Sequence, residues 1–430
     1  MTYRKTLDFL YAQLPMYHRV GAAAFKKDLT NTLALCEHLG NPHRAFKSIH
    51  VGGTNGKGSV SHLLAAVCQA AGLKTGLYIS PHYKDFRERI KVDGHYIARQ
   101  EVADFVANHR EAIERIQPSF FELCVAMAFD HFARQRVDVA IIEVGLGGRL
   151  DSTNVIEPLL SVITNISYDH QNMLGDTLPQ IAFEKAGIIK PRVPVVVGET
   201  HPESAPVFLK KAAETESPII FADQHFLAVE KRSDAWGHSF YDVFKDEKLY
   251  LENLEMQAAG PFQSRNLATA IQAVEVLSRE ALPLHLHHLR EGLRHVREFT
   301  RFMGRWQIIG TRPTILCDSA HNEAGLRLAF EKITEDTTPR RLHIVTGFVN
   351  DKDVDKALRC FPREAGYYFA KANIPRGLDA QMLRARAAAH GLHGSAYSSV
   401  KNALKAAKRA AAPEDMIVVI GSIFVVAEVL

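Results

Sequence analysis

Short runs of apolar residues alternate with helical patterns along most of the chain. Residues 48–51 form the first clear run, and after a glycine-rich turn the apolar residues of 60–68 recur on one face of a predicted helix. Three further runs, each followed by polar residues, have the character of buried strands: 137–144, 160–166 and 193–197. Open parallel sheets place their ligands at such carboxyl ends. The alternation predicts a parallel α/β sheet with helices between its strands.

A second alternating series begins after a charged stretch, residues 296–305, which we expect to be a linker. Beyond it, strands are predicted at residues 314–317, 342–346, 367–370 and 416–420. A chain of 430 residues also exceeds the size at which a single core stops growing. We therefore predict an α/β protein with a larger N-terminal P-loop domain built on a mostly parallel sheet (1–297) and a smaller C-terminal Rossmann-like α/β domain (298–430).

Composition narrows the class of protein. Hydrophobic residues make up 47% and charged residues 23% of the chain, as in ordinary globular proteins. The net charge of +4 comes from well-mixed charges, which argues against a nucleic-acid-binding protein. No window approaches about twenty uncharged apolar residues, and the start of the chain lacks a signal-peptide core, so we expect a cytoplasmic protein without a membrane partner. The five scattered cysteines favour reduced thiols over disulfides or a zinc site.

The most specific motif is the glycine-rich turn at residues 53–59, Gly-Thr-Asn-Gly-Lys-Gly-Ser. Such a turn between a strand and a helix lets backbone N–H groups converge on phosphate oxygens, and Lys57 adds a full positive charge. Gly58 separates Lys57 from Ser59, whereas Ser or Thr usually follows the lysine directly. The alternative is a glycine turn that only starts a helix. The preceding strand, the following amphipathic helix and the lysine favour binding of the phosphates of ATP.

Polar residues near the predicted strands are candidate metal ligands. Glu143 ends an apolar run and precedes a glycine-rich loop, which suits Mg²⁺, but a glutamate in a surface turn fits the strand context equally well. Asp169-His170 follows one run and Glu184-Lys185 precedes another, yet a single histidine is more often structural. The segment Asp318-Ser319-Ala320-His321-Asn322 follows the run 314–317 in the same way, and helix capping is the favoured interpretation there.

Taken in order, these segments resemble those of the folylpolyglutamate synthase and dihydrofolate synthase family, within the Mur ligase superfamily. Residues 50–59 are similar to the family's phosphate loop, including the glycine between lysine and serine. Arg87 departs from the usual asparagine, and Met303 stands where proline usually precedes Gly-Arg. The resemblance runs from about Leu14 to the carboxyl terminus and includes the segments Ser80-Pro81-His82, 86–90, 119–122, 143–154, 169–170, 184–188, 263–266, 304–307, 318–322 and Asp351-Lys352-Asp353.

The resemblance implies two Mg²⁺ ions beside the nucleotide phosphates. Ser80 and Glu143 would hold one ion. His170 would hold the other together with Lys185, whose amine would be carbamylated and so become a carboxylate-like ligand. The catalytic residues implied are Lys57, Glu143, His170 and Lys185. The implied ATP-binding residues are Gly53, Thr54, Asn55, Gly56, Lys57, Gly58, Ser59, Asn266, Arg305, Asp318 and His321. The implied folate-binding residues are Phe121, Arg149 and Asp151, and Ser422 is the candidate for binding glutamate.

The implied activity is that of an ATP-dependent amide ligase. It would add L-glutamate to dihydropteroate and to (tetrahydro)folate polyglutamates through an acyl-phosphate intermediate. Residues 148–151 resemble the loop of dual-activity bacterial enzymes, so we expect both activities. We also expect only small-molecule substrates and a monomer.

Two alternatives to this activity remain. A ligase of peptidoglycan precursors is disfavoured because only about 50 residues precede the phosphate loop, too few for a further nucleotide-sugar domain. A noncatalytic ATP-binding protein on the same scaffold is disfavoured by the intact Lys57, Glu143, His170 and Lys185.

Overall fold

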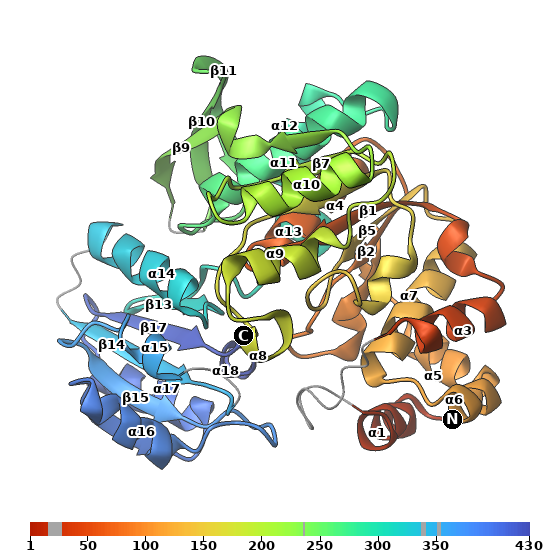
Figure 1. Cartoon of the computed structure of the whole chain (residues 1–430). Coiled ribbons are helices and arrows are strands. Elements are labelled where there is room, and N and C mark those ends of the chain that lie inside the picture. Colours follow the sequence, from red (N-terminus) through yellow and green to blue (C-terminus); the bar gives the residue numbers. More distant parts are fainter. Residues whose placement is uncertain (16–27, 235–236, 337–340, 351–353) are drawn as a thin grey trace. The chain divides into compact units, whose positions relative to one another are not determined.

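The computed structural model describes residues 1–15, 28–234, 237–336, 341–350 and 354–430, so the segment Asp351-Lys352-Asp353 lies outside the described residues. The chain divides into two compact units (Figure 1). The first unit comprises Met1–Lys231, Phe240–Met256 and Ser264–Phe302. The second unit comprises Arg232–Ser239, Gln257–Gln263 and Met303–Leu430.

An eight-stranded sheet, counted within the described residues, forms the framework of the first unit, in the order β4-β3-β2-β5-β1-β6-β7-β8. Six neighbouring strands, β2-β5-β1-β6-β7-β8, pair in parallel. Strand β3 pairs antiparallel with both β2 and β4. The strands expected from the apolar runs of this half are present as β1, β5, β6 and β7. The bounds are β1 (Lys47–Gly52), β2 (Thr75–Tyr78), β3 (Ile90–Val92), β4 (His95–Tyr96), β5 (Val139–Glu143), β6 (Leu160–Ile163), β7 (Val195–Val197) and β8 (Ile219–Phe221).

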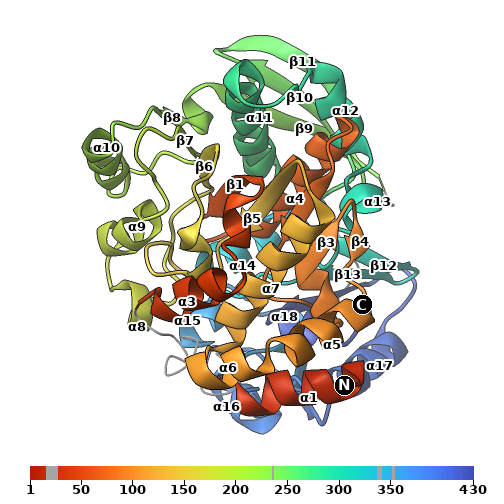
Figure 2. The ribbon, with the colours of Figure 1, turned by 90° about the vertical axis from the view of Figure 1, so that its right-hand side faces the viewer.

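Two helices illustrate how local sequence positions the elements around this sheet. Helix α7 (Phe120–Gln135) begins at a capping box, in which the side chains of Ser119 and Glu122 each accept the backbone N–H of the other residue. Its Phe129 and Phe132 belong to a core cluster that also contains Ile142 of β5. Helix α4 (Lys57–Ala70) starts within the glycine-rich segment 53–59 and packs against β1, β2 and β5, with α12 and α13 beside it (Figure 2).

The remaining elements of the first half surround these. The helices are α1 (Tyr3–Gln13), α3 (Thr30–His38), α5 (Arg99–Asn108), α6 (Arg110–Ile116), α8 (Gln171–Leu174), α9 (Leu178–Ala186), α10 (Ala205–Glu214), α11 (Gln263–Glu280), α12 (Leu286–Arg294) and α13 (Val296–Thr300). A separate three-stranded sheet follows β8 in the chain, in the order β11-β10-β9, with bounds β9 (Phe226–Ser233), β10 (Ser239–Lys245) and β11 (Lys248–Met256).

The segment expected to be a linker, 296–305, starts as ordered structure. Its first five residues form α13, and Val296 and Thr300 are fully buried. The chain therefore stays in the first unit as far as Phe302. None of the helices in the described part of the chain has the length and apolar character needed to span a lipid bilayer.

The second unit is built on a six-stranded sheet, counted within the described residues, in the order β12-β13-β17-β14-β15-β16. Only β12 pairs antiparallel there. The four strands predicted in this half are β13, β14, β15 and β17. The bounds are β12 (Gln307–Thr311), β13 (Thr314–Asp318), β14 (Leu342–Gly347), β15 (Gly366–Ala370), β16 (Gly394–Tyr397) and β17 (Met416–Gly421), with helices α14 (Glu323–Asp336), α15 (Val354–Leu358), α16 (Ala380–Ala389), α17 (Val400–Ala410) and α18 (Ile423–Ala427).

Candidate active site

The glycine-rich turn connects the carboxyl end of β1 to the first residue of α4. Gly53 and Gly56 both have positive φ angles, 134° and 85°. A Cβ atom on Gly53 would lie 1.9 Å from Oγ1 of Thr164, and one on Gly56 would lie 2.2 Å from Oδ1 of Asn266. Both positions therefore require glycine, because the backbone conformation and the lack of space exclude a side chain. The turn is held tightly at the amino end of a helix, where the helix dipole favours an anion.

The segment after β6 supports this turn from one side. The backbone N–H of Thr54 donates to the carbonyl of Asn165 (2.9 Å), and that of Asn55 donates to Oδ1 of the same Asn165 (3.0 Å). Thr54 and Ser167 exchange a second pair of hydrogen bonds through the Thr54 hydroxyl. These supporting residues were not predicted from the sequence, although a polar run directly after a strand is a signal that points to them.

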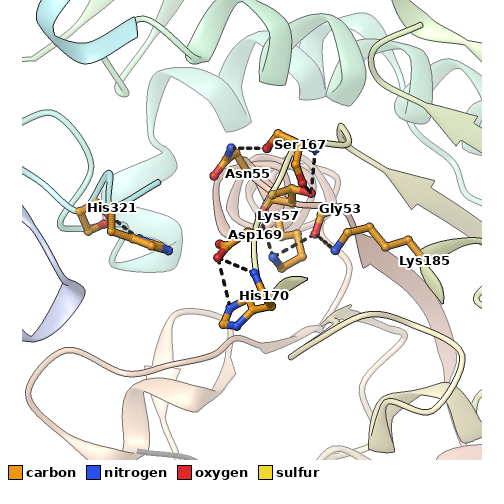
Figure 3. Close-up of polar contacts among 10 residues, drawn as sticks. Gly53, Asn55, Lys57, Ser167, Asp169, His170, Lys185 and His321 are labelled. Atoms are coloured by element: carbon orange, nitrogen blue, oxygen red, sulfur yellow. Dashed lines mark hydrogen bonds and ion pairs between the residues drawn. The ribbon is translucent and has the colours of Figure 1, made fainter. Parts of the chain in front are cut away.

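Two lysine side chains converge on one carbonyl of the turn, as Figure 3 shows. Nζ of Lys57 donates to the carbonyls of Gly53 (3.1 Å) and Thr54 (3.0 Å), and Nζ of Lys185 donates to the Gly53 carbonyl (2.8 Å). Lys185 is 4% exposed. Burial and the charge of Lys57 lower the pKa of Lys185 to about 7. A large share of this amine is therefore unprotonated at neutral pH and able to add to carbon dioxide, so the residue fits carbamylation.

Asp169 and His170 lie after β6, on the lysine side of the turn (Figure 3). His170 precedes α8 with φ at 50°, and its backbone N–H donates to Oδ1 of Asp169 (2.9 Å). Nε2 of His170 is 3.8 Å from the same oxygen. The charge of Asp169 favours the protonated form of Lys185 and raises its pKa, whereas burial lowers it. The structure therefore brings Lys57, Lys185, Asp169 and His170 into one neighbourhood.

Glu143 and Ser80 form the second predicted pair. Glu143 ends β5, is 4% exposed and accepts the backbone N–H of Ser80 through Oε2 (2.8 Å). A Cβ atom on Gly58 would lie 3.5 Å from Oε1 of Glu143, so the carboxylate faces the first turn of α4. A carboxylate and a hydroxyl are the hard oxygen ligands that Mg²⁺ prefers, and this donor set fits that ion. Within the described residues, no three His, Cys, Asp or Glu side chains gather around one point, so a metal here would need ligands of other kinds.

The residues expected at the folate lie around the loop that follows β5. The ring of Phe121 covers Gly145, where a Cβ atom would come within 2.4 Å of Cζ. Arg149 is half exposed, bonds to Oε1 of Glu184 (2.8 Å) and lies over the ring of Phe183. Phe121, in the first turn of α7, thus lies against this loop, and Arg149 is part of the loop itself.

Asp151 is inside the same loop. It is 2% exposed, and its oxygens accept the N–H groups of Leu146 (2.8 Å) and Thr153 (3.0 Å). Burial raises the pKa of Asp151. The hydroxyl of Thr153 also bonds to Asp151 and to Nε2 of the buried His50. In this structure the Asp151 carboxylate shapes the loop from within.

The predicted nucleotide residues of the second unit gather at the carboxyl end of β13, although Arg305 comes from the segment before β12. Asp318 is 3% exposed and accepts the N–H groups of Trp306 and Ala320, both at 2.8 Å, and burial raises its pKa. The guanidinium of Arg305 bonds to the Ser319 hydroxyl, and Nδ1 of His321 is 2.9 Å from the Ser319 carbonyl (Figure 3).

The helix-capping interpretation of the segment 318–322 is confirmed at its last residue. Asn322 accepts the N–H of Gly325 in the first turn of α14 (2.9 Å), so Asn322 is the residue that contacts this turn. Ser422 does act as a cap, because it precedes α18 and accepts the N–H of Phe424 (3.3 Å). Ser422 is 6% exposed.

A parallel sheet with a glycine turn and two convergent lysines, followed by a second α/β unit, is typical of a phosphate-loop nucleotide-binding protein. Family comparisons match residues 51–274 to the Mur ligase middle domain and residues 304–423 to the Mur ligase glutamate ligase domain. The chain belongs to the Mur ligase family, in its branch of folylpolyglutamate and dihydrofolate synthases, and is an acid–amino-acid ligase. This confirms the family predicted from the sequence.

Three similar proteins show how far the likeness extends. The folylpolyglutamate synthase of Lacticaseibacillus casei is 34% identical, over 100% of this chain and 98% of its own length. The dihydrofolate synthase/folylpolyglutamate synthase of Bacillus subtilis is 35% identical over 82% of each chain. The structure of E. coli FolC in complex with DHPP and ADP superposes with a TM-score of 0.85 at 28% identity, covering 100% of this chain and 97% of that chain.

Proposed function

We propose that this chain uses ATP to join L-glutamate to dihydropteroate and to folates that already carry glutamate. The observation that carries the proposal is the convergence of Lys57 and Lys185 on the Gly53 carbonyl, in a turn whose Gly58 faces the Glu143 carboxylate. Two amines and a carboxylate thus surround the turn that we assign to phosphate binding. The E. coli relative with bound ADP and DHPP supports the same pair of ligand classes for this chain.

The chemistry follows from the poor reactivity of a carboxylate. The γ-phosphoryl group of ATP would form a bond to the folate carboxylate oxygen while its bond to the β-phosphate oxygen breaks, giving an acyl phosphate and ADP. The amine of glutamate would then attack the acyl carbon, lose a proton, and displace phosphate to leave an amide. The backbone N–H groups of residues 53–59 and Lys57 would orient the phosphates.

The metal ligands belong to the same proposal. Ser80 and Glu143 would hold one Mg²⁺, and His170 with carbamylated Lys185 would hold a second. Bound there, the ions would neutralise charge on the phosphoryl oxygens. Mass spectrometry of the intact protein under carbon dioxide tests the modification, since an unmodified Lys185 in the active enzyme would contradict it.

The remaining residues would bind the substrates. We assign Asn266 to adenine, Arg305, Asp318 and His321 to the nucleotide, and Ser422 to glutamate. Phe121, Arg149 and Asp151 would bind the folate, and Asp151 would also hold the loop after β5 in shape. Residues 1–297 would form the ATP-binding domain and 298–430 the glutamate-ligase domain, in a cytoplasmic monomer whose closure excludes water from the acyl phosphate.

A product assay tests the activity. The purified protein is incubated with ATP, Mg²⁺, L-glutamate and either dihydropteroate or tetrahydrofolate, and the products are weighed by mass spectrometry. We expect both substrates to gain glutamyl residues with equal release of ADP. A protein that extends tetrahydrofolate but makes no dihydrofolate would contradict the dual assignment, and nucleotide binding without any ADP release would favour the noncatalytic alternative. A substrate carboxylate enriched in heavy oxygen should pass that label to phosphate if the acyl phosphate forms.

A further inference from the structure

Glu199, the residue two positions after β7, contacts two different parts of the proposed nucleotide site. Its Oε1 accepts a hydrogen bond from Nδ2 of Asn165 (3.0 Å), and its Oε2 accepts one from Nη1 of Arg265 (2.6 Å). Asn165 lies beside the glycine-rich turn, and Arg265 is in the first turn of α11. All of these residues belong to the first unit. One carboxylate thus connects two segments that are a hundred residues apart in the chain.

The link to Asn165 reaches the turn itself. Asn165 accepts the backbone N–H of Asn55 through Oδ1 (3.0 Å) and that of Thr54 through its carbonyl (2.9 Å). Two successive N–H groups of the turn are therefore held by one residue. The position of the turn depends on which end of the Asn165 amide faces it, since only the oxygen end can accept from Asn55.

Glu199 determines that orientation. An ionised carboxylate only accepts hydrogen bonds, so the NH₂ group of Asn165 must face Glu199 and the oxygen must face Asn55. The reverse orientation would place two acceptors together at Glu199 and two donors together at Asn55. Each mismatch would leave a partly buried polar group unsatisfied.

The link to Arg265 has a different consequence. Glu199 is the more covered partner, with 25% of its side chain exposed against 54% for Arg265. The guanidinium balances the Glu199 charge, which would otherwise oppose an anion at the turn. Arg265 immediately precedes Asn266, whose Oδ1 lies against Gly56. The same carboxylate therefore helps to place the start of α11 against the turn.

We propose that Glu199 is a positioning residue for nucleotide binding, acting on the glycine-rich turn through Asn165 and on the start of α11 through Arg265. None of the motifs shared with the family includes it. The inference rests on the proposed function, because it assumes that the turn binds phosphate.

Calorimetric titration of ADP and Mg²⁺ into the full chain tests the proposal. We expect Glu199→Leu to raise the Kd for ADP roughly ten-fold, the scale of a lost hydrogen bond to a charged group. Glu199→Gln keeps an acceptor for Asn165 and should weaken binding less. Glu203→Gln, an exposed glutamate of the same segment, is the matched control and should leave the Kd unchanged.

Kinetics and a double variant separate positioning from a general structural role. We expect Glu199→Leu to raise KM for ATP, with little change in kcat or in KM for glutamate. Glu199→Leu should raise the Kd for ADP less in the Asn165→Leu background than in the wild type, because the hydrogen bond between Asn165 and Glu199 is already lost in that background. Equal ADP affinity in the wild type and the Glu199→Leu variant would overturn the proposal. If Glu199→Leu does not fold, an unchanged Kd in Glu199→Gln overturns it instead. Absence of ADP binding by the wild type would refute the phosphate site itself.

Discussion

Two lysines of the first unit are buried almost equally, one at the glycine-rich turn and one beside the last helix of that unit. Lys185 is 4% exposed and donates to the Gly53 carbonyl (2.8 Å), while Lys91 is 2% exposed and donates to the Thr300 carbonyl (2.9 Å). Burial lowers the pKa of each amine to about 7. By burial and pKa alone, the two residues are the same kind of site.

Their neighbours distinguish them. The Lys185 amine shares its carbonyl with Lys57 and lies beside a turn built of glycines. The Lys91 amine lies 5.8 Å from the centre of the Tyr96 ring and holds the end of α13, which is further fixed by a hydrogen bond between the Thr300 hydroxyl and Nδ1 of His62 (2.6 Å). The charge of Glu143 also acts on the Lys91 amine, yet this amine binds the end of a helix whereas Lys185 binds the glycine-rich turn, so we expect the functional role at Lys185.

The strongest test of this comparison replaces each lysine by methionine, which has a similar length and no charge. We expect Lys185→Met to lower kcat by a factor on the order of a hundred to a thousand, as removal of a group that stabilises transition-state charge does in other enzymes. Lys91→Met should keep kcat within a few-fold of the wild type. The measurement is ADP release under saturating substrates. Equal losses of kcat in the two variants would show that the reaction depends on a buried amine at either position, and not on the convergence of Lys185 with Lys57.

Much of this architecture could be predicted from the sequence because its signals are local. The buried strands β1, β5, β6 and β7 lie within apolar runs of the sequence. The turn at 53–59 could be predicted from its glycines, and two of them, Gly53 and Gly56, have positive φ angles in the structure. The strands β2, β3 and β4 were missed because each contains polar residues or glycine, whereas the equally short β6 and β7 lie within longer apolar runs.

The convergence of side chains could not be predicted in the same way. Lys57 and Lys185 meet because β1 and β6 are neighbours in the sheet, and that pairing is a property of the topology. Asn165 and Glu199 belong to loops that carry no motif. Asp151 matches the family's loop in sequence, but its burial and its bonds to Leu146 and Thr153 appear only in three dimensions.

The second prediction concerns Lys91 and the dependence of the free energy of unfolding on pH. Its amine is neutral in the folded protein above pH 7 but keeps a proton in the unfolded chain up to its ordinary pKa of 10.5. The unfolded state therefore binds more protons between these values, and the free energy of unfolding should rise with pH by up to about 1.4 kcal/mol per pH unit for this group.

Chemical denaturation of the wild type and Lys91→Met between pH 7 and 9 measures this slope. The stability of the wild type should rise relative to the variant, because the contribution of Lys185 is common to both and cancels. Parallel curves across this range would contradict a lowered pKa at Lys91.

The smallest effect is expected at Thr300, where the anchoring of α13 can be weakened without touching either lysine. Thr300 is fully buried, and its hydroxyl bonds both to His62 and to the Val296 carbonyl (2.5 Å). Thr300→Ser keeps these bonds and removes one buried methyl group, so the free energy of unfolding should fall by about 1 kcal/mol.

The matched variant Thr300→Val keeps the volume but removes the hydroxyl, and it should cost more because two buried hydrogen bonds are lost. Denaturation measures both costs, and the Kd for ADP should stay at the wild-type value in Thr300→Ser. If Thr300→Ser instead weakened ADP binding at unchanged stability, the end of α13 would act on the nucleotide site. The contrast between a functional lysine and a structural one would then fail, because the Lys91 contact would also serve the reaction.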